Sequence, residues 1–256
     1  MNKIKYFLKI GKKTYLEEFA NGILYCSDAE TFWGIEDKLK MKGQGDILEA
    51  GSRIFAQNVM MQAHDSGDIT TINMKSNVLV HIEPAKHIPV FCLFSVYEED
   101  CELDETGQYF IALSPEKQKT IKEHFPKADS IAIIKNPEQF LENVINSIGC
   151  AVKHEEVHYF HIDKGLEIEG SEQTAMDTQY MLYLMQDVPP IIENGAKRYV
   201  FLADYAFRAL FCKDVFFKDE QEYRIVLPDK RISGSERFPV EISEKIEIVP
   251  LEKYVK

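Results

Sequence analysis

The sequence predicts an α+β protein with a mixed, mainly antiparallel sheet core and peripheral helices, folded as one domain over residues 1–256. Two observations predict this class. Strand-like runs occur at both ends of the chain, and the middle mixes strands with two helices whose ends are clearly marked. No repeat, low-complexity tract or linker divides the chain, which indicates a single domain.

The first expected elements are a strand, a short helix and a second strand. Ile4 to Ile10 is strand-like, and Thr14 can cap a helix over residues 15–20. Asn21-Gly22 is typical of a helix end, after which residues 23–26 resume as a strand.

Between about residues 52 and 96, β-rich runs are separated by turn-forming residues at 65–68, at Ser76-Asn77 and at Glu83-Pro84. The runs are Arg53–Met61, Ile69–Met74, Val78–Ile82 and Ile88–Val96. This pattern predicts an antiparallel meander.

Two helices follow whose starts carry the same signal. Ser114-Pro115 and Asn136-Pro137 each place a capping side chain before a proline in the first helical position. The first helix is expected to end near His124 and the second at Gly149, with residues 130–134 between them as a buried strand. The elements expected in the last third are a strand at 157–162, helices near 176–185 and 203–211, a strand at 220–227 and a β-rich segment at 238–249.

Composition limits the function classes. With 45% hydrophobic and 28% charged residues the chain can bury a substantial core. No apolar run is long enough for a membrane span, and the N-terminus lacks signal-peptide features, so we expect a cytoplasmic protein without a membrane partner. The net charge of −12 disfavours a stable grip on nucleic acid, although lysines between residues 3 and 13 form one basic cluster.

Metal chemistry is poorly supported. Five cysteines are scattered without paired spacing, which predicts neither disulfides nor a cysteine zinc site. His154-Glu155-Glu156-Val157-His158 matches the His-Glu-x-x-His zinc motif, but that motif requires a helix. The alternating residues that follow predict a strand, in which the two histidines stand about 13 Å apart and cannot share one ion.

The most informative segment is the pair Glu220 and Glu222 at the start of a strand-like stretch. In an extended chain both carboxylates lie on one face with Cα atoms about 6 to 7 Å apart, close enough to share one substrate. The alternative interpretation is an ordinary surface ion pair. Arg224 lies on the same face, and exposed Glu/Arg neighbours contribute under about 1 kcal/mol to stability.

Three segments together resemble an uncharacterised family of bacterial proteins. The first is the strand Phe7-Leu8-Lys9-Ile10, followed by a short helix and Asn21-Gly22-Ile23-Leu24-Tyr25. The second is the strand at 90–96, and the third is the strand that holds Glu220 and Glu222. The likeness is best at 15–27 and 211–227. After Ser27 the chain departs from the Phe-Asn-Asp-Pro of that family.

The same layout is more distantly similar to the ADP-ribosyltransferase superfamily, which implies a split β-sheet core. In that superfamily the first strand carries Arg or His, the second Ser or Tyr and the third Glu. The matching positions here are Lys9, Ser95 and Glu222. Lys9 departs from the pattern, and a lysine cannot copy the bidentate contacts of arginine.

The resemblance implies an enzyme that consumes NAD as substrate. Glu222 would stabilise the oxocarbenium character of the ribose, and Glu220 would orient or deprotonate the acceptor. Tyr25 or Phe94 would stack on nicotinamide, with Ser27 also at the NAD site.

Three readings of the function stay open. The preferred one is a toxin-type or phage-defence transferase that modifies a protein or nucleic acid and is silenced by an antitoxin or inhibitor protein. The second is an NAD glycohydrolase using the same site. The third is a non-enzymatic acidic protein that binds a basic partner.

Overall fold

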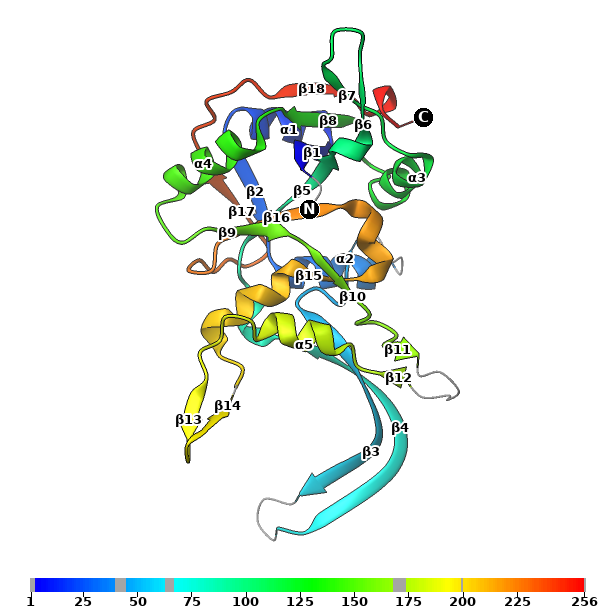
Figure 1. Cartoon of the computed structure of the whole chain (residues 1–256), viewed down its shortest axis with the longest axis vertical. Helices are drawn as coiled ribbons and strands as arrows, with labels where there is room; N and C mark the ends of the chain where they lie inside the picture. Colours follow the sequence, from blue (N-terminus) through cyan, green and yellow to red (C-terminus); the bar gives the residue numbers. More distant parts are fainter. Residues whose placement is uncertain (1–2, 40–44, 63–66, 168–173, 199, 256) are drawn as a thin grey trace.

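The computed structural model describes residues 3–39, 45–62, 67–167, 174–198 and 200–255, and its centre is an eight-stranded sheet. The strands are β1 (Ile4–Gly11), β2 (Ile23–Ser27), β5 (Val90–Tyr97), β8 (Ser130–Ile134), β9 (Lys153–Glu156), β16 (Glu222–Val226), β17 (Ser235–Pro239) and β18 (Glu247–Pro250). They run in the order β17-β2-β5-β1-β8-β18, with β16 and β9 joined beside β5 (Figure 1). All of their pairings are antiparallel, so the predicted α+β class is confirmed.

Helices cover both faces of this sheet. They are α1 (Lys13–Ala20), α3 (Pro115–His124) and α4 (Pro137–Ile148). Side chains alternate along β1, so Phe7 packs with Phe19 of α1 and Phe140 of α4, whereas Leu8 packs on the opposite face with Ile121 of α3. Two separate hydrophobic cores therefore sandwich the sheet.

The expected cap of the first helix is wrong, because Thr14 lies inside α1, which begins at Lys13 and has no side-chain cap. The expected starts of α3 and α4 are confirmed by their capping contacts. Ser114 Oγ accepts a hydrogen bond from the backbone N–H of residue 117, and Asn136 Oδ1 accepts one from residue 139. Gly149 ends α4 with φ of 66°, a left-handed conformation that favours glycine. The predicted buried strand at 130–134 is β8, in which every residue is buried.

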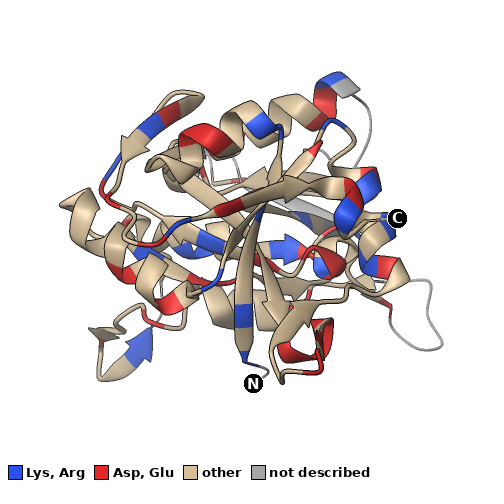
Figure 2. Ribbon diagram, turned by 90° about the horizontal axis from the view of Figure 1, so that it is seen from above, with Lys and Arg blue, Asp and Glu red and all other residues tan. Residues whose placement is uncertain are grey.

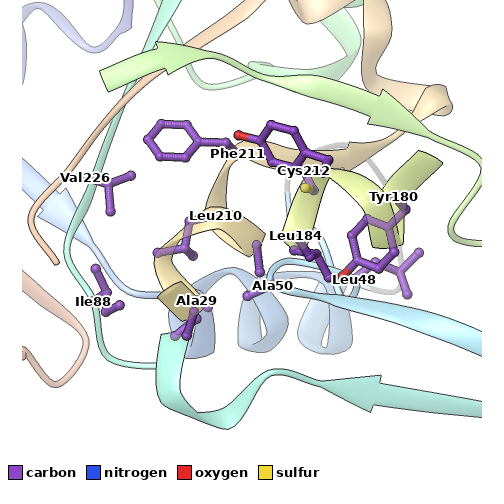
Figure 3. Packing of buried hydrophobic residues seen from close by; sticks show 14 of the residues in the cluster. Ala29, Leu48, Ala50, Ile88, Tyr180, Leu184, Leu210, Phe211, Cys212 and Val226 are labelled. Atoms are coloured by element: carbon purple, nitrogen blue, oxygen red, sulfur yellow. The ribbon is translucent and has the colours of Figure 1, made fainter. Parts of the chain in front are cut away.

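A third hydrophobic core lies beyond the sheet (Figure 3). It joins α2 (Ala29–Leu39), α5 (Thr178–Leu184) and the 3-10 helix η3 (Ala203–Phe211). Ala29, Tyr180, Leu184, Leu210 and Phe211 pack together there. The helical patterns at 176–185 and 203–211 are therefore confirmed, the second as 3-10 rather than α-helix.

The meander expected between residues 52 and 96 is not formed. Instead β3 (Gly51–Gln62) and β4 (Ile69–His81) form one long hairpin that projects from the body (Figure 1). Ser76 and Asn77, which we expected to form a turn, pair with β3 inside the ladder. The next strand, β5, pairs with β1, β2 and β16 and not with β4.

Shorter elements complete the described part of the chain. They are η1 (Glu83–Ala85), η2 (Glu98–Asp100), β6 (Cys101–Leu103), β7 (Tyr109–Ile111), β10 (His158–Phe160), β11 (Leu166–Glu167), β12 (Thr174–Ala175), β13 (Ile191–Glu193), β14 (Ala196–Arg198), β15 (Cys212–Asp214), η4 (Val215–Glu220) and η5 (Leu251–Lys253). Within the described ranges, no helix combines the length and apolar character needed to cross a membrane.

The sheet is split along one edge of β5. Phe94 pairs with β1 on one edge and with β16 on the other, and Val90 likewise pairs with β2 and with β16. β1 and β2 therefore occupy the two ends of the same edge. In the described ranges no strand pairs with residues 91–93 on that edge, and Lys9 Nζ crosses the gap to donate to Cys92 O at 2.7 Å. A split sheet is what we predicted, although this geometry alone does not identify a family.

Truncation of a core residue of α4 tests the packing on the sheet. Phe140 is fully buried, so Phe140→Ala should lower the free energy of unfolding by about 3 to 5 kcal/mol in urea denaturation. Ile145 on the same helix is 43% exposed, and Ile145→Ala should cost about 1 kcal/mol or less. Equal losses for the two variants would contradict this packing.

Candidate functional site

Two adjoining cavities lie at the split in the sheet, and both are lined by Lys9, Ile10, Phe32, Cys92 and Phe125. The smaller one, of about 160 Å³, is named the charged cavity. Its other polar lining residues include Asp46, Glu49, Lys213, Glu220, Glu222 and Arg224. The larger one, of about 490 Å³, is named the aromatic cavity, and its lining includes Tyr15, Tyr25, Ser27, Phe91 and Arg237.

Arg224 forms the centre of the charged cavity. Its side chain is 1% exposed, and both terminal nitrogens donate to Glu49, at 2.5 and 2.8 Å. Its Nε donates to Glu222 Oε1 at 2.8 Å, and Nη1 also donates to the backbone oxygen of Leu210. Glu222 and Arg224 meet because alternate residues of β16 lie on one face.

Lys213 of β15 joins the two glutamates that the sequence singles out. Its Nζ lies 2.6 Å from Glu220 Oε2 and 3.0 Å from Glu222 Oε2. His124 of α3 contacts the other oxygen of Glu220 at 2.7 Å through Nδ1. Glu220 and Glu222 therefore share one buried ammonium, and neither lies on an open solvent face.

The backbone between these glutamates corrects the expectation of one continuous strand. Glu220 ends η4, and Gln221 has φ of 42°, a left-handed conformation that costs free energy for a residue other than glycine. The Gln221 side chain supports this turn by donating to Ser95 O at 2.7 Å and to Asp100 Oδ2 at 2.8 Å. The turn at Gln221 connects Glu220, at the end of η4, to Glu222, at the start of β16, and both carboxylates reach Lys213.

Neighbouring cations keep Glu222 ionised. Burial by itself would raise the pKa of Glu222, but Arg224 and then Lys213 outweigh it and hold the pKa well below the usual range. Burial lowers the pKa of Lys9, whose Nζ also lies 4.3 Å from the centre of the Phe91 ring.

Asp46 is the carboxylate of the charged cavity with an unused acceptor. It is 3% exposed, and its Oδ1 accepts from the backbone N–H of Leu48 at 2.9 Å. Within the described part of the chain no group hydrogen-bonds to Oδ2. Burial raises the pKa of Asp46 to about 7, with Glu49 adding to the rise and Lys213 opposing it.

The aromatic cavity combines a half-exposed ring with a cation. Tyr25 is 50% exposed, and the guanidinium of Arg237 lies 5.4 Å from its ring centre. Arg237 Nε also contacts Glu18 at 2.9 Å. Ser27 lines the same cavity, and its Oγ lies 2.9 Å from Ser235 Oγ. Such a surface suits a planar ring with an anionic group attached.

The structure brings most of the predicted site residues together. Lys9, Phe94, Glu220 and Glu222 line the charged cavity, while Tyr25, Ser27 and again Lys9 line the aromatic cavity. Ser95 is fully buried and lines neither of these two cavities, so the expected second-strand position does not reach the site.

Sequence reasoning missed four polar residues of the charged cavity. They are Asp46, Glu49, His124 and Lys213. Each comes from a segment without a recognisable motif. Only Lys213 carried a usable signal, because a lysine inside the apolar run 209–217 must find a buried partner.

Other predicted motifs have ordinary roles. His154 lies in β9 and His158 in β10, so the chain is extended here as expected, although the strand predicted at 157–162 is formed only over His158–Phe160. His154 Nδ1 lies 2.7 Å from the hydroxyl of Tyr223, whereas His158 lies 3.9 Å from Glu155.

The N-terminal lysines do not form the single basic cluster that we expected. Lys5 pairs with Glu98 at 3.3 Å, and Lys13 lies 3.9 Å from Glu17. Figure 2 shows Lys and Arg interspersed with Asp and Glu over the elements.

One further group of side chains has the spacing of metal ligands. Oxygen or nitrogen atoms of Asp28, Glu30 and His87 lie within 4.8 Å of one another. Asp28 already accepts hydrogen bonds from Thr31, and Glu30 pairs with Lys86 at 2.9 Å. These contacts explain the cluster as the N-terminal cap of α2.

Removal of the Arg224 charge should be strongly destabilising. Arg224→Met leaves Glu49 and Glu222 buried without their shared partner, so urea denaturation should show a loss of about 3 to 5 kcal/mol. Arg237→Met, which removes a 55% exposed side chain, is the matched control and should cost under about 1 kcal/mol. A small loss for Arg224→Met would contradict the buried network.

Asp46→Asn should change how stability depends on pH. The folded-state pKa of Asp46 lies above its unfolded value, so stability is lost as pH rises from about 4 to 7. Urea denaturation should find the variant about 2 to 4 kcal/mol more stable than wild type at pH 8, with little difference at pH 4. Asp104→Asn should show the opposite sign, because a hydrogen bond from Thr106 lowers the pKa of Asp104.

No family model, curated protein or solved structure matches this chain. Its function therefore has to be inferred from the split in the sheet and from the charges that line it.

Proposed function

We propose that this chain is an NAD-consuming enzyme of the ADP-ribosyltransferase type that acts in the cytoplasm on a macromolecular acceptor. The observation that carries the proposal is the carboxylate of Glu222, which is buried in the lining of the charged cavity between Lys213 and Arg224. Cleavage of the bond between nicotinamide and ribose builds positive charge on the sugar. A fixed carboxylate in a water-poor site stabilises that charge.

The placement of Glu222 supports this role. Its carboxylate lines the charged cavity together with Lys9, Lys213 and Arg224. An oxocarbenium ion that develops on the sugar would be stabilised by this carboxylate, whereas neutral ground-state ribose would not, and this difference favours the transition state.

The aromatic cavity offers a place for the rest of NAD. A nicotinamide or adenine ring can stack on Tyr25, and Arg237 and Lys9 supply positive charge for the pyrophosphate. Ser27 adds a hydroxyl at the same wall, and Phe94 closes the charged cavity. Ser95 has no role in this arrangement.

The small volume of the charged cavity favours a second candidate, an NAD glycohydrolase. A space of about 160 Å³ accommodates water more readily than a protein or nucleic acid group. The reading in which the strand acids are surface salt bridges is wrong, because Glu220 and Glu222 are both 7% exposed.

The biological setting that we propose is a toxin or phage-defence enzyme. Uncontrolled consumption of NAD harms the cell that makes the enzyme, so such a protein needs an antitoxin or inhibitor protein as partner.

Incubation with NAD labelled on its adenylate part, in the presence of cell extract, tests the activity. We expect free nicotinamide together with label on a macromolecule, or free labelled ADP-ribose if water is the acceptor. Glu222→Gln should lower the rate of nicotinamide release about 100-fold or more. Wild-type protein that forms neither nicotinamide nor labelled product would contradict the proposal.

Two controls separate chemistry from folding. Glu222→Gln leaves Lys213 and Arg224 short of one partner, so its circular dichroism and urea transition must be recorded alongside its activity. Glu222→Asp keeps the charge but retracts the carboxylate by about one bond length, and it should lose activity with a smaller change in stability. Glu247→Gln, in an exposed pair with Lys135, should keep wild-type activity.

A further inference from the structure

The four carboxylates of the charged cavity differ in how fully their oxygens are used. Glu49 is held by both terminal nitrogens of Arg224. Glu222 is held by Arg224 and Lys213, and Glu220 by Lys213 and His124. Asp46 alone among these four has an oxygen, Oδ2, for which the described residues supply no hydrogen bond.

A carboxylate that acts as a general base needs an oxygen with a free lone pair, and its protonation must not break existing contacts. Glu220, the residue that the sequence suggested for this task, fails on both counts, because protonation would break contacts of 2.6 and 2.7 Å with Lys213 and His124. Protonation of Asp46 at Oδ2 breaks no hydrogen bond in the described part of the chain and removes a buried charge.

We propose that Asp46 is the general base that takes the proton from the acceptor, a catalytic role that rests on the NAD-consuming function proposed above. The acceptor's oxygen or nitrogen forms a bond to C1′ of the ribose. The bond from C1′ to the nicotinamide nitrogen breaks, and its electron pair neutralises the pyridinium. The proton of the acceptor moves to Asp46 Oδ2 and is later released to solvent, so each turnover yields nicotinamide, the ADP-ribosyl product and one proton.

The setting of Asp46 suits this task at neutral pH. With a pKa of about 7, set mainly by burial, it is half ionised near neutrality and can both accept and release a proton. Charged or titratable groups face the same cavity from β1, β5, α3, β15, η4 and β16 and from the segment that carries Asp46. They are Lys9, Cys92, His124, Lys213, Glu220, Glu222, Arg224 and Glu49.

The position of Asp46 is also fixed. Its Oδ1 accepts from Leu48 N–H at 2.9 Å, and the backbone N–H of Asp46 donates to Phe32 O of α2 at 3.3 Å. Asp46 itself lines the charged cavity, and Phe32, to which its backbone is bonded, lines both cavities.

The test is the pH dependence of nicotinamide release for wild type, Asp46→Asn and Asp46→Glu, with kcat and KM measured separately. Wild-type kcat should rise with pH to a plateau, with a midpoint near 7. Asp46→Asn should lose this rise and lower the plateau kcat by 100-fold or more with little change in KM. Asp46→Glu should recover the pH dependence in part, and Asp104→Asn, in an exposed turn, should match wild type.

The outcomes separate the two proposals. A folded Asp46→Asn protein that keeps both the wild-type plateau and its pH midpoint would overturn the role of Asp46 and leave the NAD-consuming function standing. Wild-type protein that releases no nicotinamide at any pH would overturn both. Because Asn retains the Oδ1 acceptor and removes a buried charge, the variant is expected to fold.

Discussion

The arrangement of the site depends on one buried guanidinium. Arg224 is almost fully removed from water, and such a charge is tolerated only where its donors are all directed at acceptors. Glu49, Glu222 and Leu210 O meet that requirement from three separate segments. Arg224 therefore connects the segment after α2, the end of η3 and the strand β16 through charged and polar contacts. Residues of all three line or border the charged cavity.

Local signals in the sequence were sufficient for α3 and α4, but not for the start of α1. The caps at Ser114 and Asn136 act within three residues of themselves, so tertiary structure had little to change. The expected turn at Ser76-Asn77 failed for the opposite reason. Those residues lie inside the ladder between β3 and β4, where backbone pairing with a distant segment outweighed a local preference.

The site was predictable only where its residues are neighbours in sequence. Glu220 and Glu222 were recognised because they are two residues apart, and the resemblance added Lys9 and Tyr25 from distant strands. Asp46 and Glu49 could not be recognised, since single carboxylates in an irregular segment look like surface residues until burial is known. Ser95 shows the converse error: the resemblance assigned it to the site, but its side chain is fully buried and lines neither of the two cavities.

The hydrogen bond from Lys9 to Cys92 O crosses the open edge of β5, at residues 91–93, with which no described strand pairs on that edge. A molecule that occupies both the charged and the aromatic cavity would lie against Lys9, because Lys9 lines both. Moving the Lys9 side chain aside would break its hydrogen bond to Cys92 O, at a cost of about 1 kcal/mol that contacts with the bound molecule would have to offset. A molecule confined to one of the two cavities can leave this hydrogen bond in place, so Lys9 couples the occupation of one cavity to that of the other.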